Sequence, residues 1–173
     1  PRRMENIVGV VKAYTTRVGA GPFPAEQNNE VGEFLRQTGH EFGTVTGRPR
    51  RCGWLDTAVV KYAAMVNSLD YLAITRLDIL DGLDTIKICT GYKYQGQLLQ
   101  EYPASLDVLE HVEPVYEEMP GWKTDISGCQ SYDELPEAAR HYVERISELV
   151  EVPLGIVSVG PNRSQTIILH DIF

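Results

Sequence analysis

A nearly continuous run of β-branched and other apolar residues, Ile7 to Tyr14 (IVGVVKAY), places the strongest constraint on the fold. Such a run is typical of a strand that is buried on both faces, as in a parallel sheet. Tyr71 to Arg76 (YLAITR) is a second probable buried strand, and Leu154 to Ser158 is a shorter one. Because helical patterns alternate with these strands, we predict an α/β fold with a mostly parallel sheet and flanking helices.

Three segments have helical character. Val31 to Gln37 is a short helix with Gly39 as its stop, and Trp54 to Val66 follows with apolar residues at helical spacing. Asp56 is placed to interact with the first-turn amides of that helix. The clearest amphipathic helix is Glu137 to Glu148. Further strands are predicted at Thr85–Tyr94, Val112–Met119 and Thr166–His170, with loops at 15–24 and 42–53 and a mostly irregular stretch at 102–122.

Composition narrows the possible functions. The 173 residues suffice for one domain, and a net charge of −8 disfavours binding to polymeric nucleic acid. No apolar run approaches the roughly 20 residues that span a bilayer, so we expect no membrane association and a cytoplasmic location. Three widely spaced cysteines without a CxxC pair argue against zinc and for reduced thiols. The abrupt opening, PRRM, is what a piece of a larger protein would show, although a small natural domain could also start in this way.

The first candidate site is Gly43 to Arg51 (GTVTGRPRR), which we call the arginine loop. Its three arginines occupy four positions and would repel one another unless anions lie nearby. Arginine presents a planar fork of donors that matches carboxylate and phosphate oxygens, and the two glycines allow backbone amides to approach a ligand. A solvated basic loop in an acidic protein remains the alternative. His40, beside this loop, is the histidine that most merits a test.

The second candidate is Thr75 to Asp78 (TRLD), which we call the guanine segment. It follows a predicted parallel strand, and ligands of open α/β sheets bind outside the carboxyl ends of strands. A carboxylate there can accept the two adjacent donors of guanine, which adenine does not offer. An ordinary turn or cap aspartate is the alternative.

Two weaker candidates also follow strands. Thr15 to Phe23 combines an arginine with glycines, and Ser158 to Arg163 offers small residues on which a flat base could lie. A Pro/Gly turn with one surface arginine is the alternative for the first segment, and a tight hairpin turn is the alternative for the second. No GxxxxGK[ST] phosphate loop occurs in the chain.

Taken together, five segments resemble the C-terminal portion of the adenylosuccinate synthetase family: VVKAYTTRVGAGPFP, GHEFGTVTGRPRRCGWLDT, NSLDYLAITRLDILDGLDTIKICTGY, EPVYEEMPGW and VSVGPNRSQTIIL. The resemblance covers residues 1–173 almost completely. It implies a large α/β domain distantly similar to P-loop proteins. It also implies an enzyme in which GTP phosphorylates the 6-oxygen of IMP and L-aspartate then displaces the phosphate.

The resemblance implies roles for individual residues. The aspartate-binding residues would be Thr44, Val45, Thr46, Gly47, Arg48, Pro49 and Arg50. The IMP-binding residues would be Arg17, Val18 and Arg48. The GTP-binding residues would be Arg50, Arg76, Leu77, Asp78, Ser158, Val159 and Gly160. In two places the sequence departs from the family pattern, since Arg76 stands at a usual lysine and Val45 at a usual threonine.

The resemblance also implies what lies outside this chain. The catalytic residues, the phosphate loop and the ligands of Mg²⁺ belong to the family's N-terminal portion, so this chain alone is expected to be inactive. A homodimer is expected, as is an unpaired sheet edge where neighbouring strands are missing. A stand-alone guanine-nucleotide-binding module without catalysis, or an anion-binding domain unrelated to purines, remains an alternative.

Overall fold

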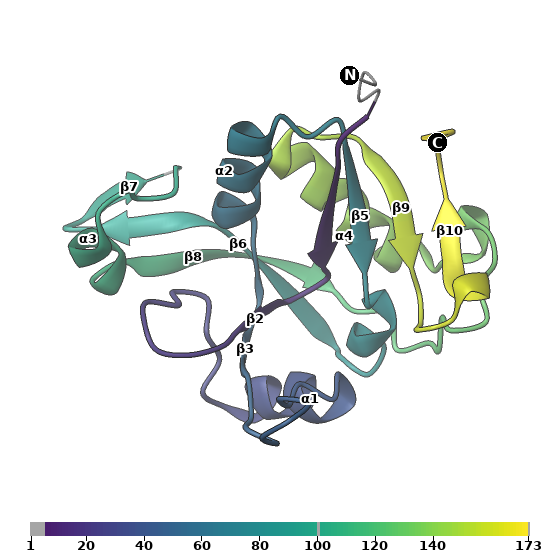
Figure 1. Ribbon diagram of the computed structural model, residues 1–173, viewed down its shortest axis with the longest axis horizontal. Coiled ribbons are helices and arrows are strands. Elements are labelled where there is room, and N and C mark those ends of the chain that lie inside the picture. Colours follow the sequence, from purple (N-terminus) through teal and green to yellow (C-terminus); the bar gives the residue numbers. More distant parts are fainter. Residues whose placement is uncertain (1–5, 100, 173) are drawn as a thin grey trace.

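The structure is a computed structural model that describes residues 6–99 and 101–172. Its first sheet has the strand order β1-β5-β9-β10. Strands β1 (Val8–Lys12), β5 (Tyr71–Thr75) and β9 (Leu154–Ser158) run parallel, and β10 (Thr166–Ile168) pairs antiparallel with β9. The three parallel strands end side by side (Figure 1). The predicted α/β fold with a parallel-rich sheet is confirmed.

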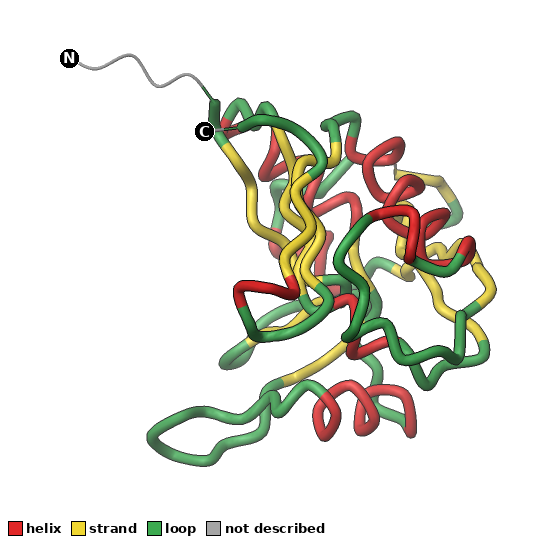
Figure 2. Tube along the Cα trace, turned by 90° about the vertical axis from the view of Figure 1, so that its right-hand side faces the viewer, coloured by secondary structure: helices red, strands yellow, loops and turns green. Residues whose placement is uncertain are grey.

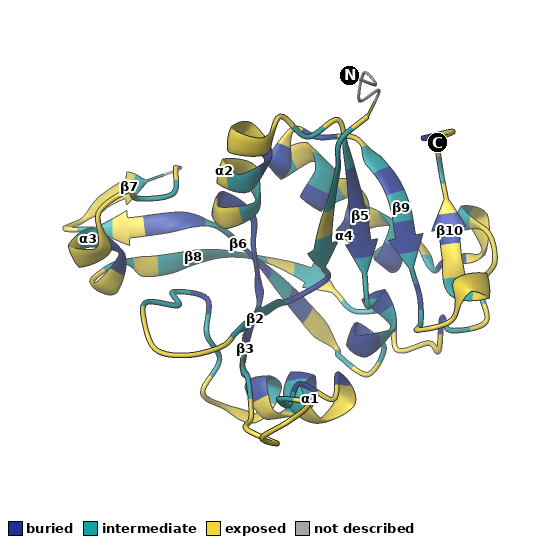
Figure 3. Ribbon diagram, viewed as in Figure 1, coloured by how far each residue is buried: buried dark blue, intermediate teal, exposed yellow. Residues whose placement is uncertain are grey.

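The apolar run of β5 forms a strand whose two faces are both covered, whereas the prediction that Ile7–Tyr14 is buried on both faces was wrong for β1, an edge strand with Val10 75% exposed. Leu72, Ala73 and Ile74 are successive residues of β5, and all three are buried. Figure 3 shows β5 and β9 as the most deeply buried strands of this sheet. A strand in such a position needs apolar side chains on both faces, which explains the missing polar alternation.

A second sheet packs beside the first. It contains β4 (Leu55–Asp56), β6 (Thr85–Tyr94), β7 (Gln97–Leu99) and β8 (Glu113–Pro120), with β8 antiparallel to β6 along most of its length. The strand predicted at Val112–Met119 is therefore confirmed as β8, within the stretch 102–122 that was expected to be mostly irregular. That stretch also holds the short helix α3 (Leu106–Glu110).

Two predicted loops are partly ordered by pairing with each other. β2 (Thr15–Arg17) and β3 (Arg51–Gly53) form a two-stranded antiparallel ribbon. The predictions of loops over 15–24 and 42–53 were wrong at these ends. This pairing joins residues far apart in the chain, so neither local pattern reveals it.

Besides α3, the described residues form three longer α-helices that surround the sheets. α1 (Glu30–Thr38) begins at Asn29, whose side chain accepts from two first-turn amides. α2 (Thr57–Asn67) begins three residues later than predicted, because residues 55–56 form β4 and the Asp56 carboxylate caps the helix by accepting from Val59 N–H. α4 (Glu137–Val150) lies behind β1 and β5 in the view of Figure 1. The remaining helical turns are η1 (Leu77–Leu80), η2 (Tyr132–Glu134) and η3 (Arg163–Gln165).

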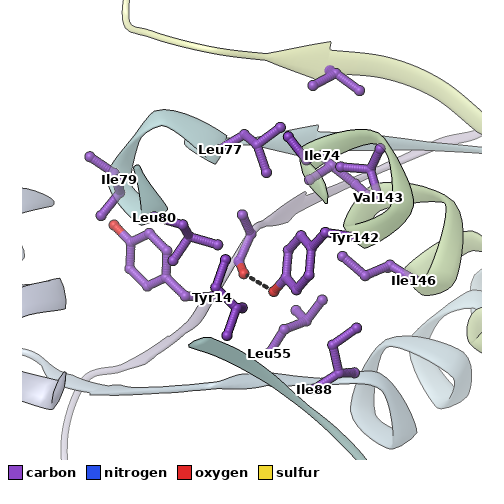
Figure 4. Packing of buried hydrophobic residues seen from close by; sticks show 14 of the residues in the cluster. Tyr14, Leu55, Ile74, Leu77, Ile79, Leu80, Ile88, Tyr142, Val143 and Ile146 are labelled. Carbon is purple, nitrogen blue, oxygen red and sulfur yellow. Dashed lines mark hydrogen bonds between the residues drawn. The ribbon is translucent and has the colours of Figure 1, made fainter. Parts of the chain in front are cut away.

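The main core lies between α4 and the ends of the parallel strands. Tyr142 of α4 is completely buried, and its hydroxyl donates to the Ala13 carbonyl at 2.6 Å (Figure 4). Ala13 follows β1 directly, so this bond fixes the chain where it leaves the sheet. Leu77 and Leu80 of η1 complete the same core, which ties the guanine segment to it (Figure 4).

β1 forms one edge of the first sheet among the described residues. Val10 on this strand is 75% exposed, and Met65 and Val66 of the nearby helix α2 are also exposed. This edge therefore combines open backbone groups with apolar side chains. Within residues 6–99 and 101–172, no helix has both the length and the apolarity to cross a membrane.

Replacing Tyr142 by Phe should lower the free energy of unfolding by about 1–2 kcal/mol, because the buried Ala13 carbonyl loses its donor. Urea denaturation measures this change. The matched control is Tyr132→Phe, whose hydroxyl donates to Glu144 at the surface and whose loss should cost less than about 0.5 kcal/mol. If both variants lose the same free energy of unfolding, the hydrogen bond from Tyr142 to Ala13 contributes no more to stability than a surface hydrogen bond.

Candidate functional site

The candidate site is organised by Glu41, a carboxylate that is completely buried. Helix α1 ends at Thr38 with Gly39 as its C-cap, and His40 then adopts a left-handed conformation with φ of 49°. That reversal turns the chain back, so that Glu41 N–H donates to the Arg36 carbonyl at 2.8 Å. The Glu41 side chain consequently points inward, whereas His40 is exposed.

Four side chains donate hydrogen bonds to the Glu41 carboxylate. Oε1 accepts from Lys12 Nζ at 2.6 Å, from the Tyr14 hydroxyl at 2.6 Å and from Arg76 at 2.8 Å. Oε2 accepts from Arg50 at 2.9 Å. Lys12 ends β1, Arg76 follows β5, and Arg50 closes the arginine loop. One carboxylate thus joins three segments that are distant in sequence.

The electrostatics of this cluster favour an ionised Glu41. Burial alone would raise the pKa of Glu41, but hydrogen bonds from Lys12 and Tyr14 and the charges of Lys12 and Arg76 outweigh it, so the pKa lies below its usual 4.5. Burial and the neighbouring carboxylate also raise the pKa of Tyr14 far above its usual 10.0, which keeps the hydroxyl a donor.

The cluster carries a surplus of positive charge. Three cations face one carboxylate, and the side chains of Lys12, Arg50 and Arg76 are 26%, 32% and 37% exposed. Each cation therefore has donors in contact with solvent as well as a bond to Glu41. An anionic ligand that binds here would balance the remaining charge.

The arginine loop closes on itself through its backbone. Gly43 N–H donates to the Arg48 carbonyl and Gly47 N–H to the Gly43 carbonyl, each at 2.8 Å. Gly47 adopts φ of 64°, a conformation that favours glycine. Residues 44–49 are exposed, and Val45 is 96% exposed. The loop therefore presents its hydroxyl groups, its backbone and Arg48 to solvent.

The guanine segment turns sharply at Arg76, whose φ of 61° is left-handed. The turn sends Leu77 into the core and leaves Asp78 half-buried. Oδ1 of Asp78 is buried and has no hydrogen-bond partner among the described residues. Burial raises the pKa of Asp78 above its usual 3.8, and its own backbone N–H and the charge of Arg76 offset this effect only in part. Such an oxygen is ready for a ligand donor.

Ser158 to Gly160 lie beside this segment, because β9 is the parallel neighbour of β5. The Ser158 hydroxyl donates to the Gly160 carbonyl at 2.9 Å. The Val159 side chain is completely buried, and a Cβ added to Gly160 would meet the Gln165 side chain at 2.3 Å. Any ligand here would therefore contact Ser158 and the backbone. Figure 2 shows the loops that gather at the lower ends of the parallel strands.

Arg17 belongs to the remaining candidate loop and is held within it. Its guanidinium donates to the Pro22 carbonyl at 3.0 Å and to the Ala20 carbonyl at 3.4 Å. Arg51 binds the same loop through the Gly21 carbonyl at 2.7 Å. Val18 is 78% exposed. These contacts shape the loop, and the exposed surface that it offers includes Val18.

Among the described residues, no group of three or more histidine, cysteine, aspartate and glutamate side chains could hold a metal ion. The cysteines are free thiols, and burial raises the pKa of Cys52 to about 11 and that of Cys89 to about 12.

The chain was compared with known protein families, sequences and solved structures. The family described as adenylosuccinate synthetase matches residues 1–167. The chain belongs to the adenylosuccinate synthetase family. It is 59% identical to the adenylosuccinate synthetase of Desulforudis audaxviator and 60% identical to that of Brachyspira hyodysenteriae. Each match covers all of this chain and 40% of the relative.

A solved structure of fully ligated adenylosuccinate synthetase from Plasmodium falciparum has the same fold. It superposes with a TM-score of 0.92 and 48% sequence identity, over 96% of this chain and 40% of that one. This chain therefore spans about 40% of the length of the synthetases that it matches.

Sequence reasoning singled out both Arg50 and Arg76 but missed the residue that joins them. Glu41 stands among 24 acidic residues, and no local pattern distinguishes it. The available signal was its position in HEFG, between a helix stop and a basic loop. Lys12 and Tyr14 were likewise counted only as part of a strand.

The ion cluster should make stability depend on pH. Because the pKa of Glu41 is lowered in the folded chain, its contribution to the unfolding free energy is complete above about pH 4.5 and is lost as the pH falls through the folded-state value. Glu41→Gln should therefore lower the unfolding free energy by about 1–3 kcal/mol at pH 6.5 and by much less at pH 3. Urea denaturation at both values measures the difference. If Glu41→Gln lowers the unfolding free energy by the same amount at pH 6.5 and at pH 3, the ionised Glu41 does not stabilise the fold through this cluster.

Proposed function

We propose that this chain is the guanine- and aspartate-binding portion of a GTP-dependent ligase that joins IMP and L-aspartate to form adenylosuccinate, in the AMP branch of purine biosynthesis. One observation carries the proposal. Glu41 bonds both Arg50 of the arginine loop and Arg76 of the guanine segment. The arginine loop, predicted to bind aspartate, and the guanine segment, predicted to bind GTP, therefore meet at one cluster. A reaction that uses both ligands requires their sites to lie close together.

The guanine step rests on Asp78. Its buried Oδ1 lacks a partner, and the two adjacent donors of guanine would supply hydrogen bonds to this carboxylate. Arg76 would lie along the base through its guanidinium plane while remaining bonded to Glu41. The residues proposed to bind GTP are Arg50, Arg76, Leu77, Asp78, Ser158, Val159 and Gly160. Leu77 and Val159 are buried, so they would contribute backbone groups.

The aspartate step rests on the arginine loop. Residues 44–50 would surround L-aspartate, with the hydroxyl groups of Thr44 and Thr46 and the guanidinium of Arg48 all on an exposed loop. Val45 would use its backbone N–H alone, because its side chain points into solvent. Arg50 would lie between aspartate and the GTP phosphates, next to the positive surplus around Glu41. Arg17, Val18 and Arg48 are proposed to face IMP.

The chemistry itself would need the rest of the family's polypeptide. We propose that this chain is the C-terminal portion, and that the catalytic residues, the phosphate loop and the Mg²⁺ ligands belong to the N-terminal portion. We further propose that the enzyme is a cytoplasmic homodimer.

Calorimetry with GDP and ADP tests the guanine assignment. The chain should bind GDP at least tenfold more tightly than ADP, and Asp78→Ala should remove most of that preference, since each lost hydrogen bond to a charged group costs about 1.5–3 kcal/mol. Asp125→Ala is the matched control, because Asp125 is a neighbouring acid that is fully exposed. The assignment fails if Asp78→Ala keeps the preference of the parent.

An activity assay tests the division of labour. The 173-residue chain should form no adenylosuccinate from GTP, IMP and L-aspartate, because its own residues supply no phosphate loop. A polypeptide of the full family length that contains this segment should form it. Turnover by the 173-residue chain alone would overturn this part of the proposal, and a full-length protein that binds GDP without turnover would favour a module without catalysis.

A further inference from the structure

The structure assigns Glu41 as a positioning residue that sets ligand specificity, an inference that rests on the proposed function. Its buried carboxylate holds Lys12, Arg50 and Arg76 in fixed positions. These cations would therefore bind a nucleotide and an amino acid in one orientation each, and would not bind small anions non-specifically.

The Glu41 carboxylate is not accessible to a ligand. Its side chain is completely shielded from solvent. Four donors already surround it, three on Oε1 and one on Oε2. Glu41 must therefore act through the cations, because it cannot touch substrate.

The cations, by contrast, still have donors to offer. An arginine has five N–H groups, and only one group each of Arg50 and Arg76 is used by Glu41. Their side chains are about one-third exposed. Bonding to Glu41 therefore fixes where each guanidinium lies without consuming its ability to bind.

Glu41 should also compete with small anions for the three cations. Its negative charge already contacts the cations to which an inorganic phosphate would bind. Removing that charge should free Lys12, Arg50 and Arg76 and raise the net positive charge of the cluster from two to three. Phosphate would then bind more tightly, whereas Arg76 would no longer be held in place for a base. A loss of folding, in contrast, would weaken both kinds of binding together.

The experiment compares the 173-residue chain with Glu41→Gln by calorimetry, using GDP, ADP and inorganic phosphate as probes at pH 7. The variant should bind phosphate about 3- to 10-fold more tightly, while its preference for GDP over ADP should fall below about 3-fold. Circular dichroism reports whether the variant is folded. Glu117→Gln is the matched control, since Glu117 accepts two hydrogen bonds from Arg145; it should alter neither affinity.

A second variant keeps the test valid if Glu41→Gln does not fold. Glu41→Asp retains the charge but shortens the side chain by one methylene, so it should not reach all its partners together. Phosphate affinity should change by less than about 2-fold, and the GDP preference should fall at least about 3-fold. Retention of the full preference in Glu41→Asp would overturn the positioning role.

The outcomes separate this inference from the proposed function. If the parent chain shows no GDP preference, the proposed function fails, whereas a gain in phosphate affinity in Glu41→Gln would still support the role of Glu41 in holding the three cations. If the parent prefers GDP and Glu41→Gln changes neither phosphate affinity nor the preference, the inference fails and the proposed function stands. Weaker binding of all three probes would mean that Glu41 serves only folding, which also overturns the inference.

Discussion

The sharing of one buried carboxylate by three cations is the interaction on which the candidate site depends. A buried charge without partners would be costly, so Glu41 requires its donors as much as they require it. Each donor comes from another part of the chain, namely the end of β1, the turn after β5 and the end of the arginine loop. The parallel pairing of β1 with β5 places two of these segments side by side. Their bonds to Glu41 join all three segments at one point.

The fold makes this arrangement possible by ending its parallel strands at one edge. Lys12 and Thr75 are direct partners in neighbouring strands, and β9 continues the same sheet. The turns after the strands therefore leave the sheet side by side, where ligands of open α/β sheets bind. Tyr142 and the leucines of η1 anchor the bases of these turns in the core (Figure 4). A rigid base with exposed, charged loops is a common basis for a binding site.

The arrangement also explains how the two departures from the family pattern can be accommodated. Arg76 retains a bond to Glu41 and still has free donors and a planar group, as its proposed contact with a base would require of a residue that replaces lysine. The Val45 side chain points into solvent, so the missing hydroxyl removes a contact from the exposed side of the loop. Neither substitution disturbs the Glu41 cluster.

Much of the fold could be predicted from sequence because its signals are local. The apolar runs of β1 and β5, the amphipathic face of α4 and the cap at Asp56 all depend on neighbouring residues. The β2–β3 ribbon depends on distant pairing, and it was missed. The candidate site likewise contains features that local sequence reveals and features that only folding reveals. Loops rich in arginine and glycine stand out, whereas the importance of Glu41 arises only when folding places it among cations.

Nuclear magnetic resonance gives the most direct test of this account, through a titration of the Glu41 side-chain carboxyl carbon between pH 7 and pH 2. A completely buried carboxyl that is held by cations should titrate below its usual value of 4.5. The midpoint should then rise when Arg50 or Arg76 is replaced by methionine. A midpoint above 4.5 in the parent chain, or one that neither replacement changes, would contradict the account.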